Sequence, residues 1–219
     1  MLAILWKDLR IEMRTKETLS SLLLLGLLTL LILSFAFDPS SELRQPAAPG
    51  VLWVAVIFAS VLGMNRSLLH EREQDCLHGL LLAPVDRGTI YLAKTTGNIV
   101  FMAAAQLFVV PTFVVFFNLP MAQTLIRLSP VLILGVIGLA AIGTLFAAVS
   151  LRTRAREVML PLLMLPLATP LVIASVEASG AVLAGQPLGA VAHWLNLVAA
   201  FDAVFLVVGW LTFEYVVEE

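Results

Sequence analysis

The sequence predicts an all-α membrane protein in which six transmembrane helices form a single domain over residues 1–219. Three observations lead to this fold class. The chain is 60% hydrophobic, with a mean hydropathy of +1.00. Only 13% of its residues are charged, against about 25% in soluble domains. Long apolar runs recur along the chain without the alternation that is typical of membrane β-barrel strands.

The first 18 residues predict an amphipathic helix in the membrane interface. Its apolar side chains recur at helical spacing, while Lys7, Asp8, Arg10 and Arg14 fall elsewhere around the helix. Such a helix buries its apolar stripe among lipid headgroups. A cytosolic extension of the first span is the alternative interpretation. The stripe consists of Leu2, Leu5, Trp6, Leu9 and Met13.

Six apolar runs qualify as spans, because about 20 apolar residues cross the hydrocarbon core. The second run is short and is completed by extending it through Leu68 and Leu69, with the flexible Arg66 reaching the interface. The segment 38–49 carries three prolines and predicts a turn-rich external loop. Small residues recur in the fourth run and predict close helix packing there. The predicted spans are about 19–37, 50–69, 95–117, 129–151, 158–176 and 194–213.

The distribution of Lys and Arg predicts the orientation. Alternate connections, together with the N-terminal segment, hold all of the 13 basic residues except Arg44 and Arg127. Basic residues are retained on the cytoplasmic side of a membrane. Both termini are therefore expected to be cytoplasmic.

A charged stretch at residues 71–94 lies between two apolar runs on this cytoplasmic side. Its polar head is followed by leucines at helical spacing, and then by a proline and a predicted turn at residues 84–88. A short amphipathic helix of this kind, over about 71–88, suits docking into a groove of a cytoplasmic protein. An ordinary solvated loop is the alternative. The predicted docking residues are Glu71, Arg72, Glu73, Asp75, Leu77, Leu80, Leu81, Pro84, Asp86 and Arg87.

Polar and helix-breaking residues inside the spans are candidates for a pathway. Asp202 lies near the middle of the sixth span, where an acid costs about 2.5–3.5 kcal/mol on insertion. It is expected to face the bundle, protonated or paired, for instance with Asn98 or Gln106. A structural hydrogen bond and a role in a conformational switch are both open. Pro161, Pro166 and Pro170 predict a kinked or broken fifth span, either as static distortion or as a segment that lines a pathway.

Several kinds of chemistry find no support in the sequence. The nearest approach to a P-loop, from Gly88 to Lys94, has Ala93 where the second glycine is needed, so the chain cannot bind ATP by that device. A net charge of −2 suggests no nucleic-acid partner. The single cysteine rules out an internal disulfide. His70 and His78 fall in the cytoplasmic loop and His193 at the outer end of the sixth span, which argues against stable bis-histidine haem ligation.

Particular strings in the chain resemble a known family. GLLLAPVDR at Gly79–Arg87, IYLAK at Ile90–Lys94 and the proline pattern at Leu165–Pro170 are similar to those of the permease B subunit of the cytochrome c maturation system, also called haem exporter protein B. Ala48-Pro49-Gly50 with Trp53 matches as well. The docking segment also resembles the coupling helix of ABC-2 type exporters. The resemblance covers essentially the whole chain, with departures at Asp75 and His78 in the docking segment.

The resemblance implies a permease of the bacterial inner membrane with an ABC-2 type fold. It implies a cytoplasmic ABC ATPase as partner, a haem-handling membrane subunit, a periplasmic haem chaperone and a second copy of the chain. Haem is then cargo rather than a stably bound cofactor, and ATP acts through the partner. The chain itself is not an enzyme. An ABC-2 exporter of lipid, polysaccharide or drug and, less favoured, a membrane haem or redox protein are the alternatives.

Overall fold

The computed structural model describes residues 2–37, 42–73, 86–150 and 156–218, which are helical except for short connections. No strand occurs in these ranges. The helices are α1 (Leu2–Thr15), α2 (Glu17–Ala36), α3 (Arg44–Glu73), α5 (Arg87–Phe116), α6 (Met121–Ser150), α7 (Arg156–Leu183) and α8 (Leu188–Glu218).

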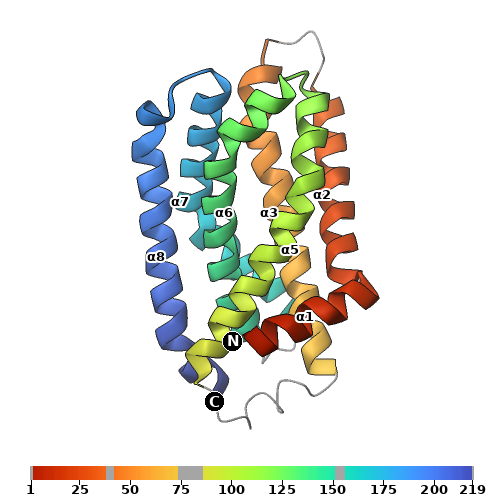
Figure 1. Cartoon of the computed structure of the whole chain (residues 1–219), viewed down its shortest axis with the longest axis vertical. Helices are drawn as coiled ribbons and strands as arrows, with labels where there is room; N and C mark the ends of the chain where they lie inside the picture. Colours follow the sequence, from red (N-terminus) through yellow and green to blue (C-terminus); the bar gives the residue numbers. More distant parts are fainter. Residues whose placement is uncertain (1, 38–41, 74–85, 151–155, 219) are drawn as a thin grey trace.

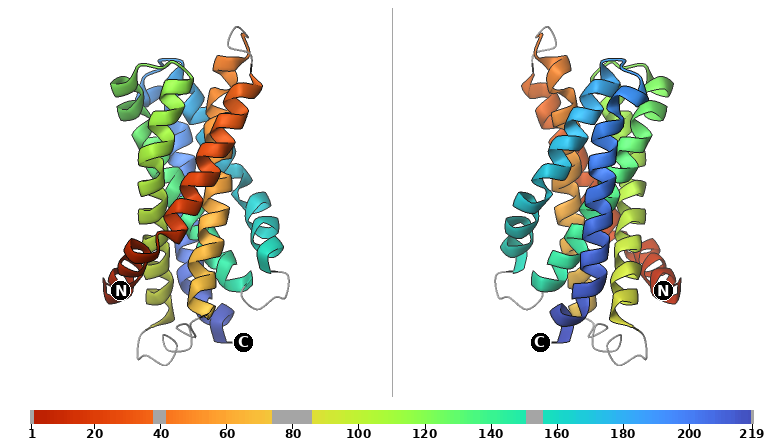
Figure 2. Two further views of the ribbon diagram at one scale, coloured as in Figure 1. Left: turned by 90° about the vertical axis from the view of Figure 1, so that its right-hand side faces the viewer. Right: turned by 90° about the vertical axis from the view of Figure 1, so that its left-hand side faces the viewer.

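Six of these helices, α2, α3, α5, α6, α7 and α8, are long and apolar enough to cross a membrane, which confirms the predicted number of spans. They run side by side as an upright bundle (Figure 1). Helix α1 lies across one end of this bundle, and both termini lie at that same end (Figures 1 and 2). We call it the terminal end. The amphipathic N-terminal helix was predicted from the sequence and is present as α1.

Helix α6 forms the centre of the bundle. In its spanning window 78% of the residues are buried, against 22% in α2 and 17% in α8. It packs on α3, α5, α7 and α8. The small residues predicted to allow close packing make this possible. A Cβ atom on Gly135 would lie 2.0 Å from the Trp53 ring, and one on Gly143 would lie 2.0 Å from the Met64 sulfur.

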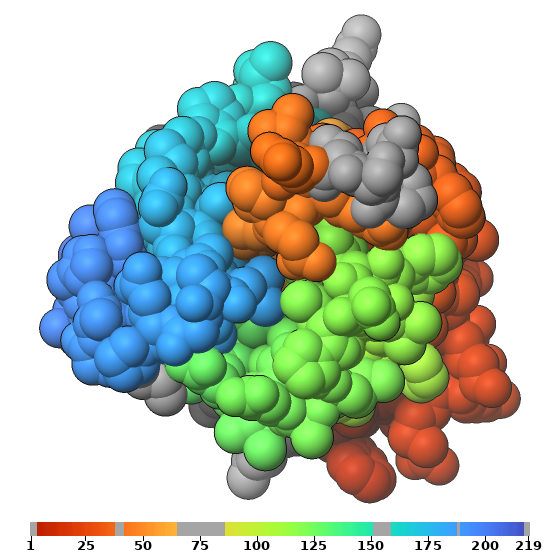
Figure 3. All heavy atoms as spheres, turned by 90° about the horizontal axis from the view of Figure 1, so that it is seen from above, coloured from red at the N-terminus to blue at the C-terminus, as the bar shows by residue number. Residues whose placement is uncertain are grey.

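At the end opposite the termini, two arginines cap helix ends. Arg44 donates to the Phe116 carbonyl at 2.8 Å, and its guanidinium lies 5.5 Å from the centre of the Phe117 ring. Arg127 donates to the Gly185 carbonyl at 3.2 Å and to the carbonyl of Gln186. Cations at a helix C-terminus interact favourably with its dipole. Figure 3, seen from above, shows the start of α3 and the α5–α6 and α7–α8 connections side by side at this end.

One local prediction is wrong, and a second is wrong in part. The segment 38–49 was expected to be a loop, but α3 already begins at Arg44. A proline in the first turn of a helix, such as Pro46, costs no internal hydrogen bond, so prolines there do not exclude a helix. The fifth span was expected to be kinked or broken; α7 continues through all three of its prolines, so it is not broken. Figure 2 shows its lower half leaning away from the bundle.

Candidate functional site

The predicted docking segment enters and leaves the bundle at the terminal end. Helix α3 continues to Glu73, beyond the predicted span limit of residue 69, and α5 begins at Arg87. The predicted turn at residues 84–88 is therefore wrong for its last two residues, which are helical. Residues 74–85 lie outside the described residues. This range contains five of the predicted docking residues, namely Asp75, Leu77, Leu80, Leu81 and Pro84.

The remaining predicted docking residues flank that range. Glu71, Arg72 and Glu73 form the last turn of α3, so the polar head continues a helix rather than starting one. Asp86 is the N-cap of α5, and its carboxylate accepts a hydrogen bond from the Thr89 amide at 3.2 Å. A side-chain cap of this kind stabilises a helix by about 1 kcal/mol. Asp86 therefore fixes the point where the chain re-enters the bundle.

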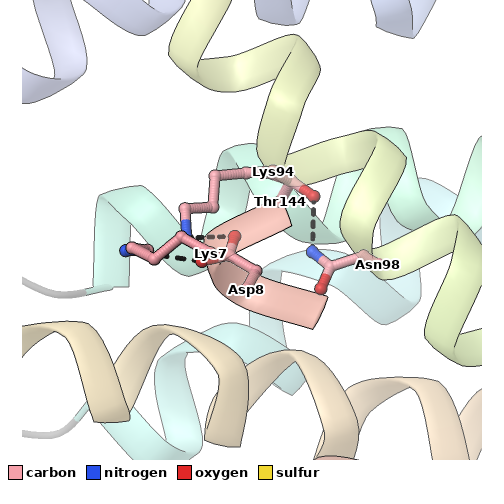
Figure 4. A network of polar contacts seen from close by, with 5 residues as sticks. All are labelled: Lys7, Asp8, Lys94, Asn98 and Thr144. Atoms are coloured by element: carbon pink, nitrogen blue, oxygen red, sulfur yellow. Dashed lines mark hydrogen bonds and ion pairs between the residues drawn. The ribbon is translucent and has the colours of Figure 1, made fainter. Parts of the chain in front are cut away.

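An ion pair joins α1 to α5 at the terminal end. The Lys94 ammonium donates to Asp8 at 2.7 Å, and the two side chains are only 5% and 12% exposed (Figure 4). Lys7 also lies 3.4 Å from Asp8. Lys94 was predicted to be a cytoplasmic charge, and its contact with Asp8 was not predicted. Asp8 and Glu12 lie four residues apart, on one face of α1, but nothing in this spacing points to a partner 86 residues away.

Glu12 fixes the corner between α1 and α2. Its carboxylate accepts a hydrogen bond from the Leu19 amide at 2.7 Å, one of the amides at the start of α2 that lack a partner within the helix. The chain turns through Lys16, which has a left-handed φ of 56°. Helix α1 is thus held at two points, in its middle to α5 through Asp8 and near its C-terminal end to α2 through Glu12.

Other buried polar groups connect the spans to one another. The Asn98 amide donates to Thr144 at 2.9 Å and joins α5 to α6 (Figure 4). The Trp53 indole donates to Ser179 at 2.9 Å and joins α3 to α7. The Tyr91 hydroxyl lies 3.0 Å from the Ala141 carbonyl of α6. These bonds account for polar groups that would otherwise be costly in an apolar interior.

Asp202 lies on the inner face of α8 and is 4% exposed. Its Oδ1 atom lies where α6 has Gly138, so close that a Cβ there would be 2.3 Å away, and Leu171 of α7 borders the same point. Neither carboxylate oxygen has a hydrogen-bond partner among the residues that the structure describes. The expected pairing with Asn98 is wrong, because Asn98 bonds Thr144. Gln106 is not a partner either, since its own amide nitrogen is unpaired.

The three prolines of α7 do not gather around a common interior space. Pro166 and Pro170 are exposed on the outside of the bundle, and Pro161 is half-buried. The buried face of α7 carries instead Leu160, Met164, Ala168 and Leu171. A pathway lined by the prolines gains no support from this placement.

The described residues offer little to hold a cofactor. Within them no group of three or more His, Cys, Asp or Glu side chains could hold a metal ion. A small cavity between α2, α3 and α5 contains Ser60 and Gln106 among apolar side chains and has no charged group in its lining. His193 is exposed at the end opposite the termini, where its Nδ1 lies 3.1 Å from the Ala190 carbonyl and its ring lies 4.8 Å from that of Trp194.

This arrangement defines a multi-span membrane protein whose described polar groups join helices and whose terminal end carries the charged connections. The chain belongs to the CcmB protein family, whose sequence model matches residues 1–218.

Curated relatives agree over most of the chain. A protein of Rhodobacter capsulatus named "Heme exporter protein B" is 28% identical over 177 residues, which is 81% of each chain. Proteins of the same name from Pseudomonas aeruginosa and Bradyrhizobium diazoefficiens are 27% and 25% identical. Those alignments cover 90% and 94% of this chain and 88% and 92% of the relatives. The family resemblance found in the sequence is thereby confirmed.

Proposed function

We propose that this chain is the transmembrane subunit of an ABC transporter complex for cytochrome c biogenesis. The observation that carries the proposal is the family match over residues 1–218, together with relatives named for haem export. The six spanning helices suit a permease subunit. The chain couples ATP hydrolysis in a partner either to haem export or to release of a haem-loaded periplasmic chaperone.

ATP hydrolysis is assigned to a cytoplasmic ABC ATPase, because the sequence lacks a phosphate-binding loop. The docking surface proposed for that partner is residues 71–87. Two features support it. The segment joins the ends of α3 and α5 at the terminal end, where most of the basic residues lie. Both flanking helices are long and continuous, so a displacement of the segment acts on the bundle through them.

The proposed orientation places the terminal end in the cytoplasm of a bacterium, with the protein in the inner membrane. All basic residues except Arg44 and Arg127 belong to connections at that end or to the N-terminal segment. The two exceptions are both engaged in capping carbonyl groups at the opposite end. Their positions therefore have a structural cause and do not weigh against this orientation.

Haem is proposed as cargo and not as a resident cofactor. The cavity between α2, α3 and α5 offers no charge to pair with the carboxylates of a haem. His193 is exposed at the end proposed to be periplasmic and is not enclosed by the bundle. The further partners implied by the family are a haem-handling membrane subunit, the periplasmic haem chaperone and a second copy of this chain.

Deletion of the gene tests the proposed function. The expected result is loss of c-type cytochromes, detected by haem staining of membrane proteins, while b-type cytochromes remain in reduced-minus-oxidised spectra. An ABC-2 exporter of lipid, polysaccharide or drug would leave both classes unchanged. A membrane haem or redox protein would instead show a Soret band in the purified chain.

Docking is tested separately by co-purification of the ATPase in detergent. Leu80→Asp and Leu81→Asp are expected to release the ATPase, because a few central apolar residues usually dominate an interface. Arg72→Ala serves as the comparison and is expected to lose less, since exposed ion pairs contribute about 0–1 kcal/mol. Full retention of the ATPase by Leu80→Asp would show that the segment is only a loop.

A further inference from the structure

The acidic side chains of α1 are turned toward the bundle. Asp8 bonds Lys94 of α5, and Glu12 accepts the Leu19 amide of α2. Both acids are therefore engaged within the molecule, and neither offsets positive charge on the outer side of the helix.

The outer side of α1 is basic and apolar. Arg10, Arg14 and Lys16 are exposed, and their side chains make no hydrogen bond or ion pair with the part of the chain that the structure describes. Between them lie Trp6 and Met13, which are 69% and 74% exposed. Trp6, Arg10 and Met13 recur at intervals of four and three, so they share one face. We call these five residues, of which Lys16 lies directly after the last residue of the helix, the outer face of α1.

The position of α1 brings this face to the membrane surface. Thr15 ends α1, and the spanning helix α2 begins at Glu17, so a single residue separates them. Figures 1 and 2 show α1 lying across the terminal end of the bundle and beside α5, outside the packed spans. The outer face therefore lies at the level where lipid headgroups meet the hydrocarbon core.

We propose that the outer face of α1 binds the headgroups of anionic phospholipids. Trp6 is amphipathic and suits the interface between headgroups and acyl chains. Arg10, Arg14 and Lys16, which have no partner among the described residues, attract phosphate and glycerol-phosphate headgroups. Attraction of this kind amounts to about fivefold in binding for each basic residue near an anionic surface. An acidic protein is a weaker match, because it would have to occupy a depth at which lipid is already present.

The proposal has a consequence for the docking segment. Lys94 lies seven residues after the start of α5, about two helical turns, and its bond to Asp8 makes α1 and the terminal end of α5 one unit. Anionic lipid bound by α1 thus holds the end of α5 that follows residues 74–85 at the membrane surface. This effect of anionic lipid on α5 does not depend on the cargo that the protein handles.

The test measures lipid composition around Trp6. The full-length protein is placed in nanodiscs of equimolar phosphatidylglycerol and phosphatidylcholine, with brominated acyl chains on one lipid or the other. Bromine quenches tryptophan on contact, and the difference between the wild type and Trp6→Phe isolates the emission of Trp6 from the other three tryptophans. Brominated phosphatidylglycerol is expected to quench Trp6 several-fold more than brominated phosphatidylcholine. Raising the salt, so that the Debye length falls from about 30 Å to about 3 Å, is expected to remove most of the preference.

A charge-matched pair of variants locates the site. Arg10→Gln/Arg14→Gln/Lys16→Gln is expected to abolish the preference. Arg152→Gln/Arg154→Gln/Arg156→Gln removes the same charge from another connection and is expected to keep it. Equal quenching by the two lipids in the wild type would overturn the proposal, and so would a preference that persists in the α1 variant. Neither result bears on cytochrome c biogenesis, so the failure of this proposal is distinguishable from the failure of the proposed function.

Discussion

The contact between Gly135 and Trp53 makes Gly135→Ala the sharpest test of how the bundle is packed. The new Cβ would lie 2.0 Å from Cη2 of the indole and 2.7 Å from Cζ3. Carbon atoms prefer separations of about 3.5–4.0 Å, so the ring must move by about 1.5 Å. Trp53 is 1% exposed and donates to Ser179, which is fully buried. A ring shift of this size breaks that bond.

The magnitude follows from three terms. Overpacking costs about 1–3 kcal/mol, and leaving the indole N–H and the Ser179 hydroxyl unsatisfied costs about 1–3 kcal/mol. Alanine recovers about 1 kcal/mol of helix propensity over glycine. The free energy of unfolding is therefore expected to fall by about 1–5 kcal/mol.

Two further glycines serve as controls for Gly135→Ala. A Cβ on Gly50 would meet nothing within 4 Å, so Gly50→Ala is expected to be neutral or slightly stabilising. Gly143→Ala would meet the sulfur and terminal carbon of Met64, a flexible side chain that can move away, and is expected to cost less than Gly135→Ala. Thermal unfolding of the full chain in detergent, followed by tryptophan fluorescence, gives the order of stability of the three variants. If Gly135→Ala unfolds at the same temperature as Gly50→Ala, the packing described for α3, α6 and α7 is wrong.

Three further predictions concern charge and orientation. Asp202→Asn is expected to lower the unfolding temperature less than Asp202→Leu. Each leucine methyl is larger than the oxygen it replaces against Gly138, and overpacking costs about 1–3 kcal/mol. Equal unfolding temperatures for the two variants would count against this. Asp8→Leu removes one partner of a buried ion pair and is expected to destabilise by about 3 kcal/mol, while Asp8→Leu/Lys94→Met recovers most of that in the same assay; a double variant no better than the single would refute it. In a Cys76→Ser background, a membrane-impermeant thiol reagent is expected to label Gln186→Cys in intact spheroplasts and to spare Glu214→Cys, both positions being exposed; labelling of position 214 would reverse the topology.

The sequence predicted the number of spans and the terminal amphipathic helix because both depend on local composition and period. The predicted ends of the spans were less accurate where a helix extends beyond its apolar run. Helix α3 begins at Arg44 and ends at Glu73, outside the predicted 50–69, because helical hydrogen bonding continues into polar sequence. In two places prolines were taken to end or break a helix that in fact continues. In the first turn of α3 a proline is compatible with a helix, and in α7 the helix continues past three of them.

The candidate sites depended on contacts between distant segments, which local pattern does not encode. Asp202 was predicted to face the bundle because an acid exposed to lipid is costly. Its burial in the structure agrees with that prediction. The neighbours of Asp202 could not be predicted in the same way, since Asn98, the expected partner, bonds Thr144 across α5 and α6 instead. The Asp8–Lys94 pair joins residues 86 positions apart and could be found only in the structure. The docking segment, assigned through residues 74–85, stays a prediction.

The chain is proposed to couple a cytoplasmic ATPase to cytochrome c biogenesis. The most direct measurement is the content of c-type cytochromes in cells whose chromosomal gene carries Leu80→Asp, with the amount of the protein in the membrane determined in parallel. We predict that c-type cytochromes fall to the level of the gene deletion, while b-type cytochromes and the membrane-inserted chain remain at wild-type levels. Normal c-type cytochromes in that strain, with the variant protein present at its usual amount, would contradict the account.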